Sequence, residues 1–123
     1  MESKNLKIYC ITSKKINYLE NLKLKIIVGG AHTNNENFPK KWLLDNINEN
    51  ISRKNINFGS LTSIYWIWKN ELKNYKKDTW IGISHYRRFW LKKNHDKIIS
   101  IDNLDKNLLD EIPDKDLDYD SFV

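Results

Sequence analysis

The sequence predicts an α/β domain in which a mostly parallel sheet is flanked by helices. Residues 6–12 (LKIYCIT) are rich in β-branched and aromatic side chains, as expected of a first, inner strand. Between Leu61 and Tyr75, apolar residues recur at the three- and four-residue spacing of a helix. Residues 80–83 (WIGI) form a short continuous apolar run, typical of a parallel strand that is covered on both faces. Alternation of strand and helix patterns indicates a parallel sheet with residues 6–12 and 80–83 near its centre.

Composition limits the classes of protein to consider. With 123 residues and 40% hydrophobic residues, the chain is long and apolar enough for one folded domain and unlike a disordered segment. Its one cysteine, Cys10, lies in an apolar run, which excludes an intrachain disulfide framework and favours a reducing compartment. The N-terminal segment is polar, and no apolar run approaches the ~20 residues of a membrane span. We therefore predict a cytoplasmic protein, with association at the inner face of the membrane left open.

Charge is unevenly distributed along the chain. The net charge is +5, yet residues 102–120 carry eight acids and two bases. We therefore predict a basic domain over residues 1–101, followed at 102–123 by an acidic tail or a truncated continuation of the domain. A basic body suits nucleic acid, anionic lipid or a phosphorylated small molecule, and net charge alone does not choose among them.

The first half of the chain supplies two loops that could meet a ligand. Lys14 follows the first predicted strand, where the loops of nucleotide-binding α/β domains commonly contact phosphate. A short helix over 17–22 and a strand over 25–28 come next, and the strand ends in the glycine pair of a tight turn. Residues 45–55 (DNINENISRKN) have the composition of a long loop, and long ordered loops are frequently functional.

The predicted helix places its apolar stripe, which includes Leu61 and Trp68, toward a core, with Ser60 as its N-cap. Trp66 projects roughly 140° from Leu61, so either the helix is buried on two sides, which we favour, or Trp66 faces a cleft. Farther along, residues 98–101 (IISI) predict an edge strand.

Four polar or charged side chains come directly after the second buried strand: His85, Tyr86, Arg87 and Arg88. In open α/β sheets, ligands bind beyond the carboxyl ends of the strands. Arginine is suited to bidentate binding of phosphate or carboxylate. The cluster therefore predicts a site for an anionic ligand.

Several blocks of the sequence, in their order and spacing, resemble a family of bacterial glycosyltransferases of capsular, exopolysaccharide and O-antigen synthesis, first known as a domain of unknown function. The resemblance covers roughly residues 6–90. The blocks are DN at 45–46, NISRKN at 50–55, LT at 61–62, YWIWKN at 65–70 and HYRRF at 85–89. Relatives usually carry a glutamate where Ser60 stands, and their domains continue well beyond residue 123.

The resemblance implies a GT-A-like, Rossmann-related sheet, incomplete at its carboxyl end, that binds a nucleotide sugar of the UDP-hexose or UDP-galactofuranose type. The implied acceptor is a glycan or lipid-linked glycan, and nucleic acid is not an implied partner. The residues expected to contact substrate, from the resemblance and the loop positions together, are Lys14, Asp45, Asn46, Asn50, Ser52, Lys54, Asn55, His85, Tyr86, Arg87 and Arg88.

Transfer from a nucleotide sugar requires stabilisation of the diphosphate leaving group and a base for the acceptor hydroxyl. GT-A enzymes often place a metal-binding Asp-x-Asp pair where this chain has His85 to Arg88. We therefore expect basic side chains to stabilise the diphosphate, with no cofactor required. Use of a divalent metal is also possible. Asp-x-Asp spacing at 116–120 lies in the acidic tail, where it arises by chance. His85 and Asp45 are both candidates for the base. The rival hypotheses are a basic, aromatic nucleic-acid-binding module and an inactive, truncated glycosyltransferase relative.

Overall fold

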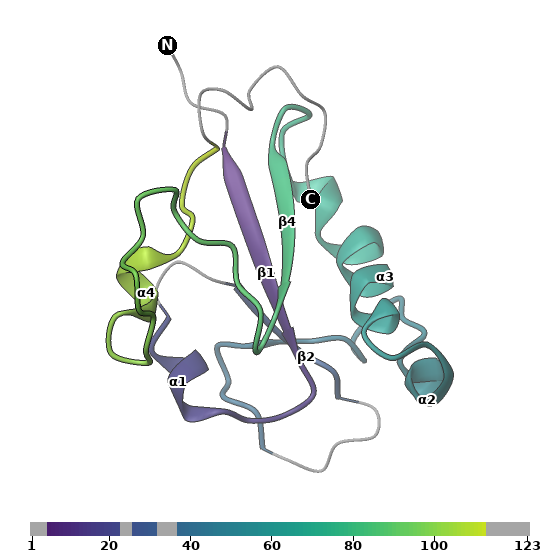
Figure 1. Cartoon of the computed structure of the whole chain (residues 1–123). Helices are drawn as coiled ribbons and strands as arrows, with labels where there is room; N and C mark the ends of the chain where they lie inside the picture. The colour runs from purple at the N-terminus through teal and green to yellow at the C-terminus, as the bar shows by residue number, and fades with distance from the viewer. Residues whose placement is uncertain (1–4, 23–25, 32–36, 113–123) are drawn as a thin grey trace.

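Four parallel strands form one sheet in the order β3-β2-β1-β4 (Figure 1). The computed structural model describes residues 5–22, 26–31 and 37–112. The strands are β1 (Leu6–Thr12), β2 (Ile26–Gly29), β3 (Leu43–Leu44) and β4 (Trp80–His85). Every strand pairing is parallel, which confirms the predicted α/β class with a mostly parallel sheet. Residue 25, the first of the second predicted strand, lies outside the described residues.

Strand β1 is the inner strand around which both cores form. It lies between β2 and β4, and its residues from Ile8 to Thr12 are buried. Successive side chains of a strand point to opposite faces. On one face Cys10 packs with Leu19 and Leu108, and on the other Tyr9 and Ile11 pack with residues of the longest helix. The run of apolar residues in β1 therefore follows from burial on both faces.

Strand β4 lies at the edge of the sheet, so its predicted central position is wrong. It pairs with β1, and within the described part of the chain no further strand pairs with its other side. The indole Nε1 of Trp90 instead donates to the Ile83 carbonyl oxygen at 2.9 Å. A continuous apolar run indicates that the faces of a strand are covered, and it does not tell whether both edges are paired.

Helices lie on both sides of the sheet (Figure 1). The short helices α1 (Asn17–Glu20) and α4 (Leu104–Asn107) lie on one side. The other side carries, in order, η1 (Ser52–Lys54), α2 (Asn55–Phe58), α3 (Leu61–Asn70) and η2 (Leu72–Asn74). The predicted helix from Leu61 is thus present, but its last turn continues as a separate 3-10 segment.

The predicted inner face of α3 is correct only in part, because Ile64, Leu72 and Tyr75 pack against the core and two other members of the stripe do not. Leu61 and Trp68 are each 57% exposed, whereas Trp66 and Ile67 are buried together with two hydroxyl residues. Burial of Trp66 is as predicted, but burial of the helix on two sides is not. The buried face is more polar than the exposed one because its polar groups find partners. For example, the Trp66 Nε1 donates to the Ile47 carbonyl oxygen at 2.7 Å.

The core continues past residue 101. Leu104, Leu108 and Ile112 are buried, although the surrounding sequence is acidic. The edge strand predicted at 98–101 does not form, and Ile98 and Ile101 are 81% and 68% exposed. The short isoleucine run has strand propensity but finds no neighbouring strand to pair with among the described residues.

Candidate functional site

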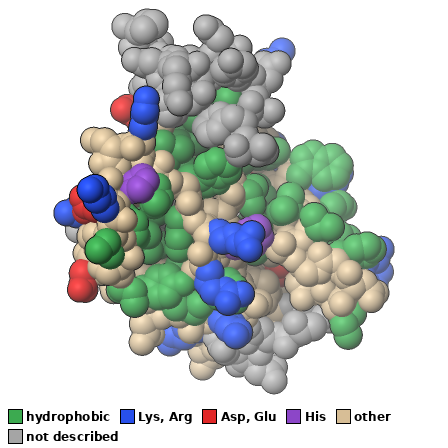
Figure 2. Space-filling view, in the orientation of Figure 1, with side chains coloured by type: hydrophobic (Ala, Val, Ile, Leu, Met, Phe, Trp, Pro, Cys, Tyr) green, Lys and Arg blue, Asp and Glu red, His purple; other side chains and the backbone are tan. Residues whose placement is uncertain are grey.

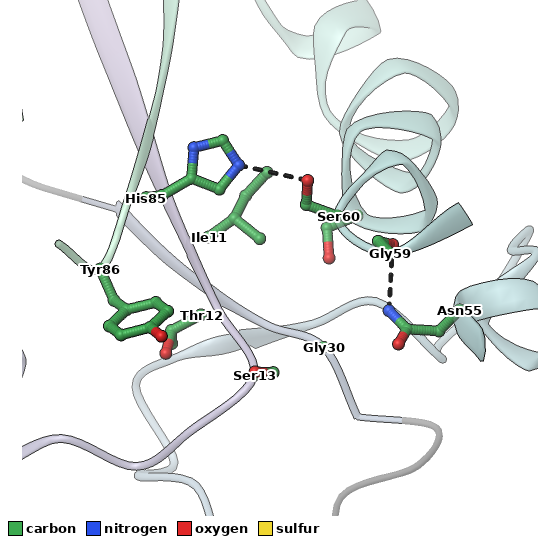
Figure 3. Close-up of a pocket in the computed structure, with 10 residues that line it drawn as sticks. Ile11, Thr12, Ser13, Gly30, Asn55, Gly59, Ser60, His85 and Tyr86 are labelled. Atoms are coloured by element: carbon green, nitrogen blue, oxygen red, sulfur yellow. Dashed lines mark hydrogen bonds between the residues drawn. The ribbon is translucent and has the colours of Figure 1, made fainter. Parts of the chain in front are cut away.

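A cavity of about 150 Å³ opens at the carboxyl ends of β1 and β4, beside the start of α3 (Figure 3). This is the position that α/β sheets use for ligands. Most of its lining side chains are polar, and they come from four separate segments that the fold brings together. The lining residues are Ile11, Thr12, Ser13, Gly30, Asn55, Gly59, Ser60, Ser63, His85 and Tyr86.

The end of β1 is fixed by the side chain of Thr12. Its buried hydroxyl donates to the Lys14 carbonyl oxygen at 2.8 Å and accepts from the Lys14 N–H at 3.0 Å. The Thr12 carbonyl oxygen accepts from the N–H of Gly30 at 2.8 Å. These bonds position Ser13 and Lys14, both exposed, at the edge of the cavity.

His85 and Tyr86 enter the site from a tight turn at the end of β4. The Nε2 atom of His85 shares a hydrogen bond of 3.2 Å with the Ser60 Oγ (Figure 3). Ser60 is the N-cap residue of α3, as predicted, but its hydroxyl is directed to this histidine and makes no side-chain cap hydrogen bond. The Tyr86 N–H donates to the Ile11 carbonyl oxygen at 3.1 Å, which anchors the turn to β1.

The other side of the turn is held by Tyr18, whose hydroxyl donates to the Tyr86 carbonyl oxygen. Burial raises the pKa of the Tyr18 hydroxyl, so the group stays protonated and remains a donor. Backbone bonds between His85 and Arg88, at 3.0 and 3.1 Å, close the turn. The backbone that carries the predicted cluster is therefore held by hydrogen bonds to β1, to Tyr18 and within the turn itself.

Arg87 and Arg88 are exposed at the turn that follows the cavity residues. The guanidinium carbon of Arg87 lies 5.1 Å from the centroid of the Tyr86 ring. No carboxylate of the described residues lies within ion-pair distance of either guanidinium. Figure 2 shows Lys and Arg side chains gathered around a histidine on this face. Both guanidinium groups are thus available to an anionic ligand.

Asp45 lies behind the cavity and holds its wall together. Its side chain is fully buried, and the carboxylate accepts from the Ala31 N–H and the Ser52 Oγ, both at 3.0 Å. The second carboxylate oxygen accepts from the Ser63 Oγ at 2.7 Å and the Thr62 Oγ1 at 3.4 Å. One carboxylate therefore joins the ends of β2 and β3 to η1 and α3. Asp45 therefore positions the segments that form the cavity wall.

The segment predicted as a long loop at 45–55 forms turns followed by η1 and the start of α2. Asn50 braces the turns, because its Nδ2 donates to the Asn46 and Asn48 carbonyl oxygens and its Oδ1 accepts from the Ser52 N–H. Asn55 is the member of this segment that lines the cavity. Its Nδ2 donates to the Gly59 carbonyl oxygen at 3.0 Å.

The structure brings together some of the residues that were predicted to contact substrate. Asn55, His85 and Tyr86 line the cavity, and Lys14, Arg87 and Arg88 are exposed next to lining residues in the chain. Asp45 and Ser52 are buried behind the cavity wall, while Asn46, Asn50 and Lys54 are exposed and do not line it.

Sequence reasoning missed the hydroxyl groups of the site: Thr12, Ser13, Ser60 and Ser63. The available signal was the Thr-Ser pair at the end of the first strand, beside which only Lys14 was considered. Gly30 was identified as a turn, but its place in the lining was not. A Cβ added there would meet Asp45 Oδ2 and Asn55 Nδ2 at 3.8 Å.

In the part of the chain that the structure describes, no three or more His, Cys, Asp and Glu side chains gather as metal ligands would. The Asp-x-Asp spacings at 116–120 lie outside that part. Across the same residues, no helix has both the length and the apolarity needed to cross a membrane.

Comparison with known protein families gives a match. A family model described as a domain of unknown function (DUF4422) matches residues 7–117. No curated protein and no solved structure matches the chain.

Proposed function

The chain belongs to the DUF4422 family, and we propose that it is a glycosyltransferase-type domain that binds a nucleotide sugar at the cavity beside β1 and β4. The observation that carries this proposal is the turn after β4. It places His85 and Tyr86 in the cavity and is followed at once by two exposed arginines. The proposed donor is of the UDP-hexose or UDP-galactofuranose type, and the proposed acceptor is a glycan or lipid-linked glycan of surface polysaccharide synthesis.

The cavity is smaller than the ~300 Å³ at which pockets for drug-sized ligands begin. It therefore takes a single group, such as the sugar ring or one phosphate. The remainder of the donor lies across the adjacent surface, where Arg87 and Arg88 contact the diphosphate. A planar guanidinium can bind two phosphate oxygens at once, which an ammonium group cannot do in the same geometry.

In the proposed reaction, an acceptor hydroxyl oxygen forms a bond to the anomeric carbon of the sugar. The bond between that carbon and the diphosphate oxygen breaks, and the nucleoside diphosphate leaves with the bonding electrons. The two arginines stabilise the charge that develops on the leaving group. Binding of the donor does not depend absolutely on a divalent metal, because the stabilising charge is supplied by side chains.

We assign to His85 the role of the general base, which takes the proton from the acceptor hydroxyl. Its ring lines the cavity and is oriented through Nε2 by Ser60, so a ligand in the cavity meets it directly. Asp45 is the less suitable base, because it is buried, does not line the cavity and has a carboxylate that already accepts from four donors.

Isothermal titration with UDP-sugars tests the proposal. We expect binding that persists in a chelator and falls about tenfold to a hundredfold in Arg88→Ala, the loss expected for a charge-assisted hydrogen bond. Lys97→Ala is the matched control, because it removes an exposed positive charge elsewhere and should leave affinity unchanged. Loss of all binding in chelator would assign the stabilising charge to a metal. Tighter binding of oligonucleotides than of every UDP-sugar would favour the nucleic-acid-binding alternative.

Transfer itself is tested separately by turnover. His85→Gln preserves a polar side chain that can still bond to Ser60 but cannot accept the proton at neutral pH. We expect it to bind UDP-sugar as tightly as the wild type and to lose most of its turnover, since general base catalysis contributes about 10²–10⁴-fold. Unchanged turnover would remove His85 from the proposed mechanism. Donor binding without turnover in the wild type would identify an inactive relative.

A further inference from the structure

The outer side of α2 and α3 exposes large hydrophobic side chains: Ile56 (82% exposed), Phe58 (50%), Leu61 (57%) and Trp68 (57%). We call these four residues the outer α2–α3 face. Figure 2 shows hydrophobic side chains gathered over these helices. Single exposed apolar residues are ordinary on protein surfaces, whereas a contiguous group marks an interaction site.

This face is fixed in its exposed orientation by the opposite side of the helix. At ~100° per residue, Leu61 and Trp68 lie within roughly 20° of each other around the axis, and Ser63 and Ile67 lie on the far side. Ser63 bonds to the buried Asp45, and Ile67 is packed into the core. The helix therefore cannot rotate to bury its outer face without breaking the wall of the cavity.

The stretch of chain that carries the outer α2–α3 face is basic. Residues 53–77 contain six Lys and Arg residues and one acid, Glu71, whose carboxylate accepts a hydrogen bond from the Tyr9 hydroxyl. The Lys69 Nζ lies 3.9 Å from the centroid of the Trp68 ring and 3.7 Å from the carboxylate of Glu49. The charged residues of this stretch are thus mostly cationic, and one of them, Lys69, lies directly on the exposed Trp68 ring.

An exposed apolar group that includes a tryptophan, with a lysine on its ring and a basic surrounding sequence, matches one partner in particular. At the surface of a bilayer, apolar side chains enter the boundary between headgroups and acyl chains, tryptophan prefers this boundary, and lysines bind anionic headgroups. A second copy of the chain would bring the same positive charge against this face and would be repelled. We propose that the outer α2–α3 face docks on the surface of a lipid bilayer that contains anionic lipids.

Docking in this manner has a consequence for the cavity. Gly59 and Ser60 line the cavity and lie between Phe58 and Leu61 in the chain, so part of the cavity wall directly adjoins residues of the docked surface. If the proposed function holds, the face selects an acceptor that is itself anchored in the bilayer by an apolar group. The docking step alone does not rest on the proposed function.

Co-sedimentation with vesicles tests the docking. The probe is the full chain with vesicles of phosphatidylcholine and phosphatidylglycerol in equal parts, compared with phosphatidylcholine alone. We expect binding to the mixed vesicles that weakens at high salt, because anionic headgroups supply part of the attraction. Absence of binding to mixed vesicles at low salt would overturn the proposal.

A matched pair of variants locates the binding surface. The double variant Leu61→Gln/Trp68→Gln removes two exposed apolar side chains without changing charge, and Ile98→Gln/Ile101→Gln does the same at a distant exposed segment. We expect the first to lower the vesicle partition coefficient about tenfold or more and the second to leave it within about twofold, with both retaining wild-type circular dichroism. Equal partitioning of the two variants would overturn the proposal.

Two further readouts separate the alternatives. A dimer in sedimentation velocity without lipid that is lost only in Leu61→Gln/Trp68→Gln would assign the face to a second copy and overturn bilayer docking. UDP-sugar titration without vesicles should give the same affinity in both double variants and the wild type. Vesicle binding with no UDP-sugar binding would refute the proposed function alone, and the reverse result would refute the docking alone.

Discussion

Replacing Asp45 by alanine should lower the free energy of unfolding by about 3–5 kcal/mol. Three donors bond closely to this buried carboxylate: the Ala31 N–H, the Ser52 Oγ and the Ser63 Oγ, at 2.7–3.0 Å. A buried donor left without a partner costs about 1–3 kcal/mol, and the two hydroxyls can partly recover by rotating toward other acceptors. The expected loss is a large fraction of the roughly 5–15 kcal/mol that holds an ordinary domain together.

Urea and thermal unfolding measure the effect, and a loss near 4 kcal/mol corresponds to a melting temperature lower by about 10–20 °C. Asp45→Asn keeps the shape of the side chain and one carbonyl acceptor, so we expect a smaller loss of about 1–2 kcal/mol. Asp102→Ala removes an exposed carboxylate and serves as the control, within about 0.5 kcal/mol of wild type.

The positioning role of Asp45 would be refuted by one pattern. If Asp45→Ala lowered stability by less than about 1 kcal/mol and abolished turnover while retaining donor binding, the carboxylate would be acting on substrate. Asp45 would then replace His85 as the proposed base.

Three further predictions concern other parts of the fold. Arg88→Ala should change the melting temperature by no more than a few degrees, because the side chain is exposed, and a large melting shift would make this arginine structural. Burial raises the pKa of the Tyr9 hydroxyl above its usual value near 10, so its stabilising contribution is intact below that pH and is lost as pH rises further, where the unfolded chain ionises first. In urea titrations above pH 10, the free energy of unfolding of the wild type should therefore fall by up to about 1.4 kcal/mol per pH unit relative to that of Tyr9→Phe. The same pH dependence in both proteins would contradict this prediction. Gly82→Ala should destabilise by about 1–3 kcal/mol, since its Cβ would lie 2.9 Å from the Ile8 Cγ1, and wild-type urea stability would show that this contact relaxes freely.

The parts of the fold that could be predicted from sequence are those set by local pattern. The apolar character of β1 reports burial on both faces, and the helical spacing after Ser60 reports a helix. The position of His85 and Tyr86 at the carboxyl end of β4 follows from chain order alone once the strand is identified. The local sequence pattern therefore located the ends of the strands and of the helix, and with them part of the cavity.

The orientation of α3 could not be predicted in the same way. Its sequence has apolar residues on both sides, and the side that turns inward is the one whose polar groups have partners. Those partners are Asp45 for Ser63 and the Ile47 carbonyl oxygen for Trp66, and both come from a segment that reads as a loop. Hydrophobic spacing cannot reveal a buried hydroxyl that bonds to a carboxylate eighteen residues away.

The role of Asp45 was hidden for a related reason. An aspartate in an Asn-rich stretch reads as a solvated turn residue or as an exposed acid. Its burial depends on four donors that come from three separate segments, and a one-dimensional pattern does not record such convergence. The same convergence brings Gly30 and Asn55 to the cavity wall.

The outer edge of β4 affects whether copies of this protein aggregate. The strand is uncharged from Trp80 to Ser84, and an uncharged edge strand is a template on which another strand can add and begin an aggregate. Two of the backbone groups that such a strand would need are already engaged. The Ile83 carbonyl oxygen accepts from the Trp90 indole, and the His85 N–H donates to the Arg88 carbonyl oxygen. Trp90 and the turn at His85 thus act as gatekeepers against sheet extension, since an incoming strand would have to displace both before it could register with β4.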